Sequence, residues 1–253
     1  MVNGAHACFH AGDLAGAIEA ARGLVAAAKP PSPSAAGRPA WAEALVAVAD
    51  GQWGPGLAAA ERALAEDPAD ALARWCRGEA RIGLGDRAGA LADWSWIVEA
   101  DPASRTAWKD RALARALLGD RAGALEDLGR LAALAPDDVV PRLWSAGLGG
   151  DPGPLLAFAT GPGWSARLAA LLLGRAEPAA LWAETTHTTV EAEWRARACQ
   201  VEGYAGLLAE REGRREEAIR RYQACVATGV WHFLTHLWAR ERLRDLGQVG
   251  TAG

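Results

Sequence analysis

The chain has 253 residues, of which 51% are hydrophobic and 23% charged, so it can bury a sizeable core and has the charge content of an ordinary folded protein. Its net charge is −4 and no domain-sized basic face stands out, which argues against a nucleic-acid partner. The longest apolar run lies near Leu168 to Leu173. It is far too short to span a bilayer, so we expect no transmembrane segment.

Residues 1–36 predict a degenerate helix hairpin followed by a linker. The segment GDLAGAIEAARGL begins at Gly12 and has the pattern of a turn and a second helix. Residues 1–11 before it predict a short first helix. The run PPSPSAAG at 30–37 then favours a linker, because Pro and Gly interrupt helices.

Residues 37–136 repeat with a period of 34. Gly51, Gly85 and Gly119 lie 34 residues apart, and a Pro closes each unit with the same spacing, at Pro68, Pro102 and Pro136. The segments GDRAGALADW and GDRAGALEDL, which begin at Gly85 and Gly119, are identical at eight of ten positions. Self-similarity of this length indicates stacked supersecondary units, each covering an apolar face of its neighbour.

Each unit predicts two helices joined by a tight turn. Trp75 and Ile82 follow a helical spacing that ends at Gly85, a residue type that readily adopts the left-handed conformation of a helix end. Asp86 is then placed to cap the second helix, which must stop before Pro102. Small residues midway along the predicted helices would let them pack closely as a hairpin: Gly78, Ala90, Ala112 and Ala124.

These residues resemble the tetratricopeptide repeat. That repeat combines an early aromatic residue, a small residue within the helix, an Ala four residues before an apolar or aromatic residue, and a closing Pro. Trp108 fits the early aromatic residue, and the Ala steps are Ala90 to Trp94 and Ala124 to Leu128. The resemblance covers roughly 37–136 and 199–247, and it implies three repeats at 37–136.

The remaining chain predicts irregular helices and then a last repeat. The period is lost over 137–198, where Gly and Pro separate short apolar segments at 143–148, 155–159, 165–173 and 178–184. A further copy of the repeat surrounds Gly213, with Gly206, Ala218 and Tyr222 at the expected offsets. We therefore expect a C-terminal repeat and a capping helix over 199–253.

The order of these parts is similar to that of bacterial repeat lipoproteins of the NlpI type, although the similarity is looser than that of the repeat. It implies an envelope-associated adaptor, with a homodimer formed through terminal helices. Cell-wall enzymes would be the clients if the mature form is periplasmic. The elements that carry the similarity are Leu143-Trp144, Trp164 to Gly174, Tyr204, Ala227 to Phe233 and Leu246-Gly247.

Together these patterns predict an all-α fold: a right-handed α-solenoid of helix hairpins with irregular middle helices and a C-terminal capping helix. Such arrays offer extended surfaces to protein partners. The functional hypothesis is a non-enzymatic adaptor or scaffold that binds a peptide or protein in its concave groove, without catalytic residues, metal or cofactor.

In tetratricopeptide arrays the first helix of each repeat lines the concave groove. Trp41 and Trp75 are the residues expected to contribute most, since large aromatic side chains dominate binding energies. The alternative is that both tryptophans belong to the core. Carried onto this chain, the groove stripe comprises Trp41, Leu45, Val48, Leu72, Trp75, Glu79, Ile82, Thr106, Lys109, Leu113 and Leu117.

Two histidine pairs have the i, i+4 spacing that can present two ligands to one metal ion. They are His6 with His10 and His232 with His236. Neither pair has the intervening Glu of a metalloprotease helix, and the spacing indicates no third ligand. The N-terminal pair is expected to fray.

Two other classes of function stay open. A metal-dependent enzyme could use His187, His232 and His236 with Glu191 or Glu193. A structural subunit could instead pack its ends or convex face into a larger complex.

The sequence as written predicts a cytoplasmic location. Asp13, Glu19 and Arg22 interrupt any apolar region near the N-terminus, so it does not resemble a signal peptide. A periplasmic or lipid-anchored protein is expected if an export signal has been removed. The four cysteines show neither paired metal spacing nor a disulfide framework and predict buried thiols: Cys8, Cys76, Cys199 and Cys225.

Overall fold

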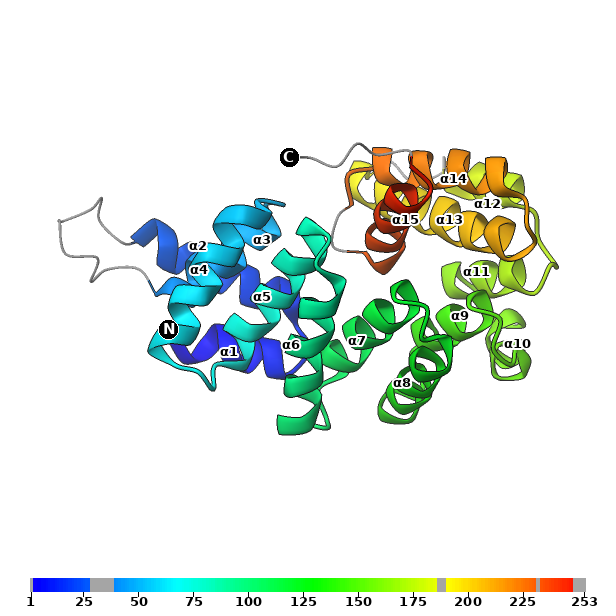
Figure 1. Ribbon diagram of the computed structural model, residues 1–253. Helices are drawn as coiled ribbons and strands as arrows, with labels where there is room; N and C mark the ends of the chain where they lie inside the picture. The colour runs from blue at the N-terminus through cyan, green and yellow to red at the C-terminus, as the bar shows by residue number, and fades with distance from the viewer. Residues whose placement is uncertain (1, 28–38, 186–189, 231–232, 248–253) are drawn as a thin grey trace. The chain divides into compact units, whose positions relative to one another are not determined.

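The computed structural model describes residues 2–27, 39–185, 190–230 and 233–247. Every regular element within these ranges is an α-helix, fifteen in all (Figure 1). Helices that follow one another in the chain pack together as hairpins in both halves of the protein. The predicted all-α fold of helix hairpins, with short middle helices and a capping helix, is confirmed. The linker predicted at 30–37 lies outside the described residues.

The chain divides into two compact units, Met1–Ala114 and Arg115–Gly253. This division lies inside the region predicted as three repeats, 37–136, and within helix α7. The first unit contains α1 (Val2–His10), α2 (Leu14–Ala27), α3 (Ala40–Ala49), α4 (Trp53–Glu66), α5 (Ala71–Leu84), α6 (Arg87–Ala100) and most of α7 (Arg105–Leu117).

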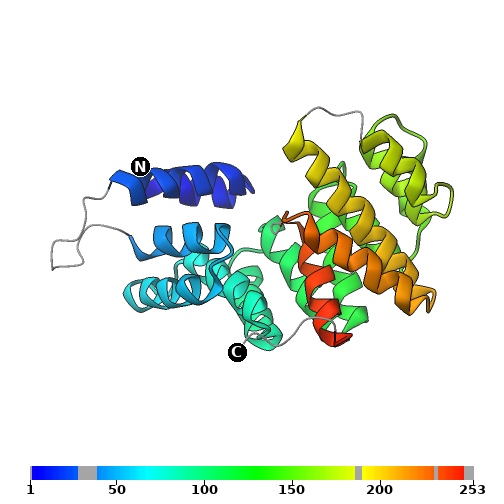
Figure 2. The same cartoon turned by 90° about the horizontal axis from the view of Figure 1, so that it is seen from above.

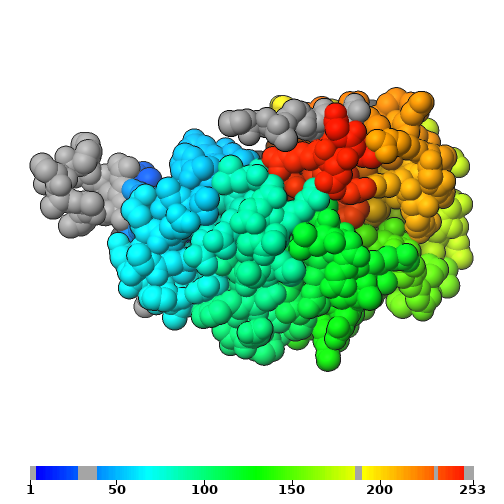
Figure 3. Space-filling model, in the orientation of Figure 1, coloured from blue at the N-terminus to red at the C-terminus, as the bar shows by residue number. Residues whose placement is uncertain are grey.

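In the first unit the hairpins α3–α4 and α5–α6 stack on each other, because α5 packs against both α3 and α4. Helix α2 packs against α1 and α3. Figure 2 shows the α1–α2 pair as a layer on one side of α3 to α6. The space-filling view in Figure 3 faces the other side of this unit, where α4 to α6 form the surface and α1 is hidden.

After the end of α7, the described residues of the second unit form one helix of 14 residues, then four short helices and then three longer ones. They are α8 (Arg121–Leu134), α9 (Val140–Gly147), α10 (Gly153–Ala159), α11 (Trp164–Leu172), α12 (Pro178–Thr185), α13 (Glu191–Arg211), α14 (Arg215–Ala227) and α15 (Leu234–Asp245). Helix α13 is continuous over 21 residues. The boundary predicted between 198 and 199 therefore falls inside a helix.

Three of the described hairpin turns share one chemical design. Gly85 adopts a left-handed conformation with φ of 90°, and the carboxylate of Asp86 accepts a 2.9 Å hydrogen bond from the amide of Gly89. This bond satisfies one of the free amides at the start of α6. A Cβ atom on Gly89 would overlap that carboxylate. The pattern Gly-Asp-x-x-Gly recurs with the same cap at Gly12 to Gly16 and at Gly119 to Gly123.

Close packing within each hairpin depends on a small residue facing a large one. Trp94 is fully buried against Gly78, and Tyr222 is fully buried against Gly206. A Cβ atom at Gly78 would lie 2.6 Å from the Trp94 ring nitrogen. Each Gly precedes its aromatic partner by 16 residues. The repeat fold therefore uses the missing side chain of Gly to admit an aromatic ring.

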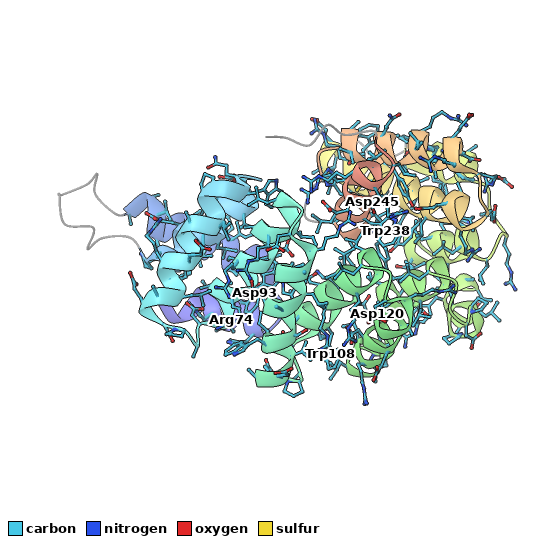
Figure 4. All side chains as sticks on the ribbon, in the orientation of Figure 1. Arg74, Asp93, Trp108, Asp120, Trp238 and Asp245 are labelled. Atoms are coloured by element: carbon cyan, nitrogen blue, oxygen red, sulfur yellow. The ribbon has the colours of Figure 1, made fainter. Side chains whose placement is uncertain are left out.

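The C-terminal helix α15 closes the second unit by packing on α13 and α14. Trp238, labelled in Figure 4, donates a 2.9 Å hydrogen bond from its ring nitrogen to the hydroxyl of Tyr222. The Tyr222 hydroxyl in turn donates to Glu210 at 2.7 Å. This buried network satisfies the polar tips of two large aromatic side chains, so α15 acts as the predicted cap.

No described helix combines the length and the apolar character that crossing a membrane requires.

Candidate functional site

The candidate site is the surface that helix α1 contacts in the first unit. It is formed by Trp41 of α3, Asp70 and Trp75 at the start of α5, Asp101 at the C-terminal end of α6 and Arg105 at the start of α7. We call these five residues the α1-binding surface. They lie between 35 and 94 residues from the groups of α1 and Ala11 that contact them, so no local sequence pattern joins them.

His6 connects α1 to both α3 and α5. Its ring packs edge-on against Trp41 with the ring centres 4.7 Å apart, and its Nε2 atom lies 3.2 Å from Oδ1 of Asp70. Asp70 also caps α5, because the same oxygen accepts a 3.0 Å hydrogen bond from the amide of Ala73. The cap of one helix therefore serves as the anchor for another.

Burial raises the pKa of the Asp70 carboxyl group, but the hydrogen bonds from His6 and from the Ala73 amide outweigh this and leave the pKa below its ordinary value. The ionised form of Asp70 is thus favoured in the folded protein. A carboxylate with a lowered pKa beside an imidazole attracts any cation at that position.

Phe9 is the apolar anchor of α1. It is 4% exposed and packs against Trp75 with ring centres 5.7 Å apart. Trp75 is held in turn by a 2.8 Å hydrogen bond from its ring nitrogen to Oδ2 of Asp110 in α7. Burial raises the pKa of Asp110, against the opposing effects of Lys109 and of the Trp75 bond. The Trp75 ring that contacts Phe9 is therefore held in place by its hydrogen bond to Asp110.

The C-terminal end of α1 is held by charge. Nδ1 of His10 lies 3.7 Å from Oδ2 of Asp101, and the guanidinium of Arg105 donates a 3.3 Å hydrogen bond to the carbonyl of Ala11. A cation at this end interacts favourably with the partial negative charge of the last carbonyl groups of a helix. Both His6 and His10 contact the rest of the unit, and the fraying expected for this pair stays a prediction.

The structure buries most of the residues predicted to line an open groove. Nine of the eleven are buried: Trp41, Leu45, Val48, Leu72, Trp75, Glu79, Ile82, Leu113 and Leu117. Thr106 and Lys109 are half-buried. The exposed stripe expected from helix register is thus not present, because neighbouring helices, and at Trp41 and Trp75 also α1, cover it. In this structure both tryptophans are buried, as the alternative reading expected. Their role in binding stays a prediction.

A second polar cluster lies between α5 and α6. The buried carboxylate of Asp93 is 2.6 Å from Arg77, 2.7 Å from Arg81 and 3.8 Å from Arg74. Figure 4 labels Arg74 and Asp93 on these helices. The guanidinium of Arg74 also lies 4.0 Å above the ring of Trp96. In the second unit Arg115 makes the equivalent 2.7 Å pair with Asp127, 34 residues further along. This recurrence marks a structural element of the hairpin.

The residues of the alternative enzyme do not come together within the described chain. His187 and His232 lie outside the described residues. His236 is buried in α15, and Glu191 is exposed and paired with Arg195 at 2.6 Å. Glu193 is paired with Arg197. Among the described residues no group of three His, Cys, Asp or Glu could hold a metal ion.

Three of the four cysteines, Cys76, Cys199 and Cys225, are buried free thiols, and Cys8 is half-buried. The sulfur atoms of Cys199 and Cys225 lie 3.5 Å apart between α13 and α14. Sequence spacing did not pair these two, which are 26 residues apart on facing helices.

Comparison with known proteins finds similarity to solved structures alone. No protein-family model matches the chain, and no curated protein matches it. One solved structure, a tetratricopeptide repeat protein from Parabacteroides merdae ATCC 43184, is 14% identical and matches with a TM-score of 0.49 over 94% of this chain and 96% of that chain. The description of this chain as a tetratricopeptide-like stack of helix hairpins accordingly depends on its own repeated turns and packing pairs.

Proposed function

We propose that this protein is a non-enzymatic scaffold that binds a helical segment of another protein at the α1-binding surface. The observation that carries the proposal is the seating of α1, whose His6 and Phe9 side chains rest on Trp41 and Trp75. A surface that receives one amphipathic helix has the chemistry to receive another. The surface also contains two tryptophans, the residue type most enriched where binding energy concentrates.

The wider setting follows the looser resemblance noted in the sequence. An NlpI-type role would make the protein a bacterial envelope-associated adaptor, with cell-wall enzymes as clients and a homodimer formed through terminal helices. The described residues support the helix-binding part of this proposal, through the contacts of α1, and the identity of the client is left to experiment.

Selection from a displayed library of 16-residue peptides on the full chain tests the proposal. The affinity of selected peptides is then measured for the wild type and for a Trp41→Leu/Trp75→Leu double variant, which keeps apolar volume at both positions. Loss of two such contacts is expected to weaken binding about 30-fold or more, the equivalent of one hot spot of about 2 kcal/mol. Circular dichroism must show that the variant keeps its helix content.

The matched control is Trp164→Leu, in α11 of the second unit, where Trp164 is half-buried and bonded to Gln200. It removes a tryptophan that lies outside the α1-binding surface. Selected peptides should bind this control as they bind the wild type. Peptides that bind the folded double variant with unchanged affinity would remove the site assignment.

A further inference from the structure

Helix α1 has the features of a ligand for the surface it covers. Its side chains His6, Phe9 and His10 stand at positions i, i+3 and i+4, which places them on one face of a helix. That face meets two tryptophan rings and two carboxylates, of Asp70 and Asp101. Phe9 supplies the apolar anchor, and the imidazoles of His6 and His10 lie beside the two carboxylates.

The same helix is short. It has nine residues, whereas isolated helices below about 12 to 15 residues are marginal in water. Beyond α2, the side chains of α1 contact the unit through the rings of His6 and Phe9, which pack on Trp41 and Trp75, and through two His–Asp contacts. Each His is partly exposed, which limits what these His–Asp contacts contribute in water. A longer helix that presents the same kinds of side chain can therefore replace these contacts and displace α1.

We infer that α1 is a built-in ligand that competes with the partner for the α1-binding surface. The partner is then an amphipathic helix that carries an aromatic side chain, a cationic side chain three positions before it and another one position after it. This inference rests on the function proposed above. Asp70 and Asp101 call for positive charge at the flanking positions. Lys and Arg carry a positive charge at neutral pH, so a Lys- or Arg-bearing helix presents a full charge to each of the two carboxylates.

The competition is set by local concentration. A segment in the same chain acts at an effective concentration that can reach the millimolar range, so a peptide added from outside sees only the fraction of molecules whose site is open. Weakening α1 raises that fraction without touching the α1-binding surface. Substitutions in α1 should therefore strengthen the binding of an external helix, which a merely structural role of α1 does not predict.

The test uses the full chain and a fluorescein-labelled peptide of residues 2–13 in which His6 and His10 are replaced by Arg. Polarisation titrations compare the wild type with a Phe9→Ala variant and with Ala7→Gln, a matched control at an exposed position of α1. We expect Phe9→Ala to lower the Kd of the peptide about tenfold or more and Ala7→Gln to leave it unchanged. A His6→Ala/His10→Ala variant repeats the comparison with the apolar anchor intact, should Phe9→Ala impair folding.

The chemistry of the partner is tested with the peptide itself. The Arg-bearing peptide should bind the Phe9→Ala chain at least about tenfold more tightly than a peptide with Glu at both positions. A peptide with Ala in place of Phe9 should not bind. Equal affinity of the Arg and Glu peptides would overturn the assigned partner chemistry.

Failure of this inference is distinguishable from failure of the proposed function. If library-selected peptides lose affinity for the Trp41→Leu/Trp75→Leu chain but bind wild type and Phe9→Ala equally, the scaffold stands and α1 is not a competitor. If the selected peptides are insensitive to both changes, the surface itself is wrongly assigned. An increase in affinity confined to the variants that weaken α1 supports both.

Discussion

Glu202 of α13 and Arg221 of α14 form a 3.2 Å ion pair at the two repeat positions that Arg74 and Asp93 occupy in the first unit, with the charges exchanged. Glu202 and Arg74 each stand eleven residues before the turn glycine of their repeat, and Arg221 and Asp93 each stand eight residues after it. These two hairpins both pair opposite charges at this site, in opposite order. The carboxylate is nearly buried in both copies.

Removing the cation of this pair should destabilise the second unit. Glu202 also accepts a hydrogen bond from the ring nitrogen of Trp182. Without Arg221, however, the buried charge of Glu202 loses the cation of this ion pair. Breaking a fully buried pair costs about 3 to 5 kcal/mol, and the partial exposure of Arg221 reduces this, so we expect Arg221→Met to cost about 1 to 3 kcal/mol. Urea unfolding measures the change. Arg220→Met, at the exposed neighbouring position, should stay within about 0.5 kcal/mol of the wild type.

The pairing of Gly206 with Tyr222 predicts that Gly206→Ala destabilises the protein. The added Cβ would lie 2.5 Å from the buried ring, and overpacking of this kind costs about 1 to 3 kcal/mol. Gly129→Ala is the matched control, because Gly129 lies inside α8 with nothing within 4 Å of an added Cβ. That change should stabilise the protein by about 0.5 to 1 kcal/mol. Effects of the same sign at both positions would contradict the packing argument.

The repeated turn predicts the effect of changes at Asp86. Asp86→Ala removes the side-chain cap of α6 and should cost about 1 kcal/mol in unfolding free energy. Asp86→Asn keeps an oxygen that can accept from the Gly89 amide, so its cost should be much smaller. Thermal unfolding of the two variants checks the difference. An Asn variant as unstable as the Ala variant would show that charge, and not the cap, is the important property.

The lowered pKa of Asp70 predicts a pH-dependent contribution to stability. An acid whose pKa is lower in the folded than in the unfolded chain stabilises the folded state at pH above its ordinary pKa, 3.8, and loses this contribution as the pH falls through the folded pKa. The stability difference between wild type and Asp70→Asn should thus be full at pH 5 to 7 and shrink below pH 3.8. Guanidinium unfolding at a series of pH values measures it. A difference that grows on acidification has the wrong sign for this account.

The hairpins could be predicted from the sequence because their signals are local. Gly85 and Asp86 fix a turn and a cap within five residues, and Pro102 fixes the end of a helix, so the same short pattern predicts the same geometry wherever it recurs. The exchange of charges between Arg74 and Glu202 was also present in the sequence. It becomes visible only when the repeats are aligned on Gly85 and Gly213.

The candidate site could not be predicted in the same way. Whether Trp41 and Trp75 are exposed depends on where α1 lies, and the contact of His6 with Asp70 joins residues 64 positions apart. Helical periodicity identifies the face that carries a side chain, but it does not identify which other helix covers that face. The residues predicted to line the groove therefore lie on a helix face that other helices of this chain cover.

Hydrogen exchange on the full chain, with and without a saturating peptide selected from the library, tests the central claim most directly. The account predicts that the amides of α1, residues 2–10, lose protection when the peptide binds, while amides at the start of α5 keep or gain protection. Unchanged protection of α1 at saturation, with protection gained elsewhere in the chain, would contradict it.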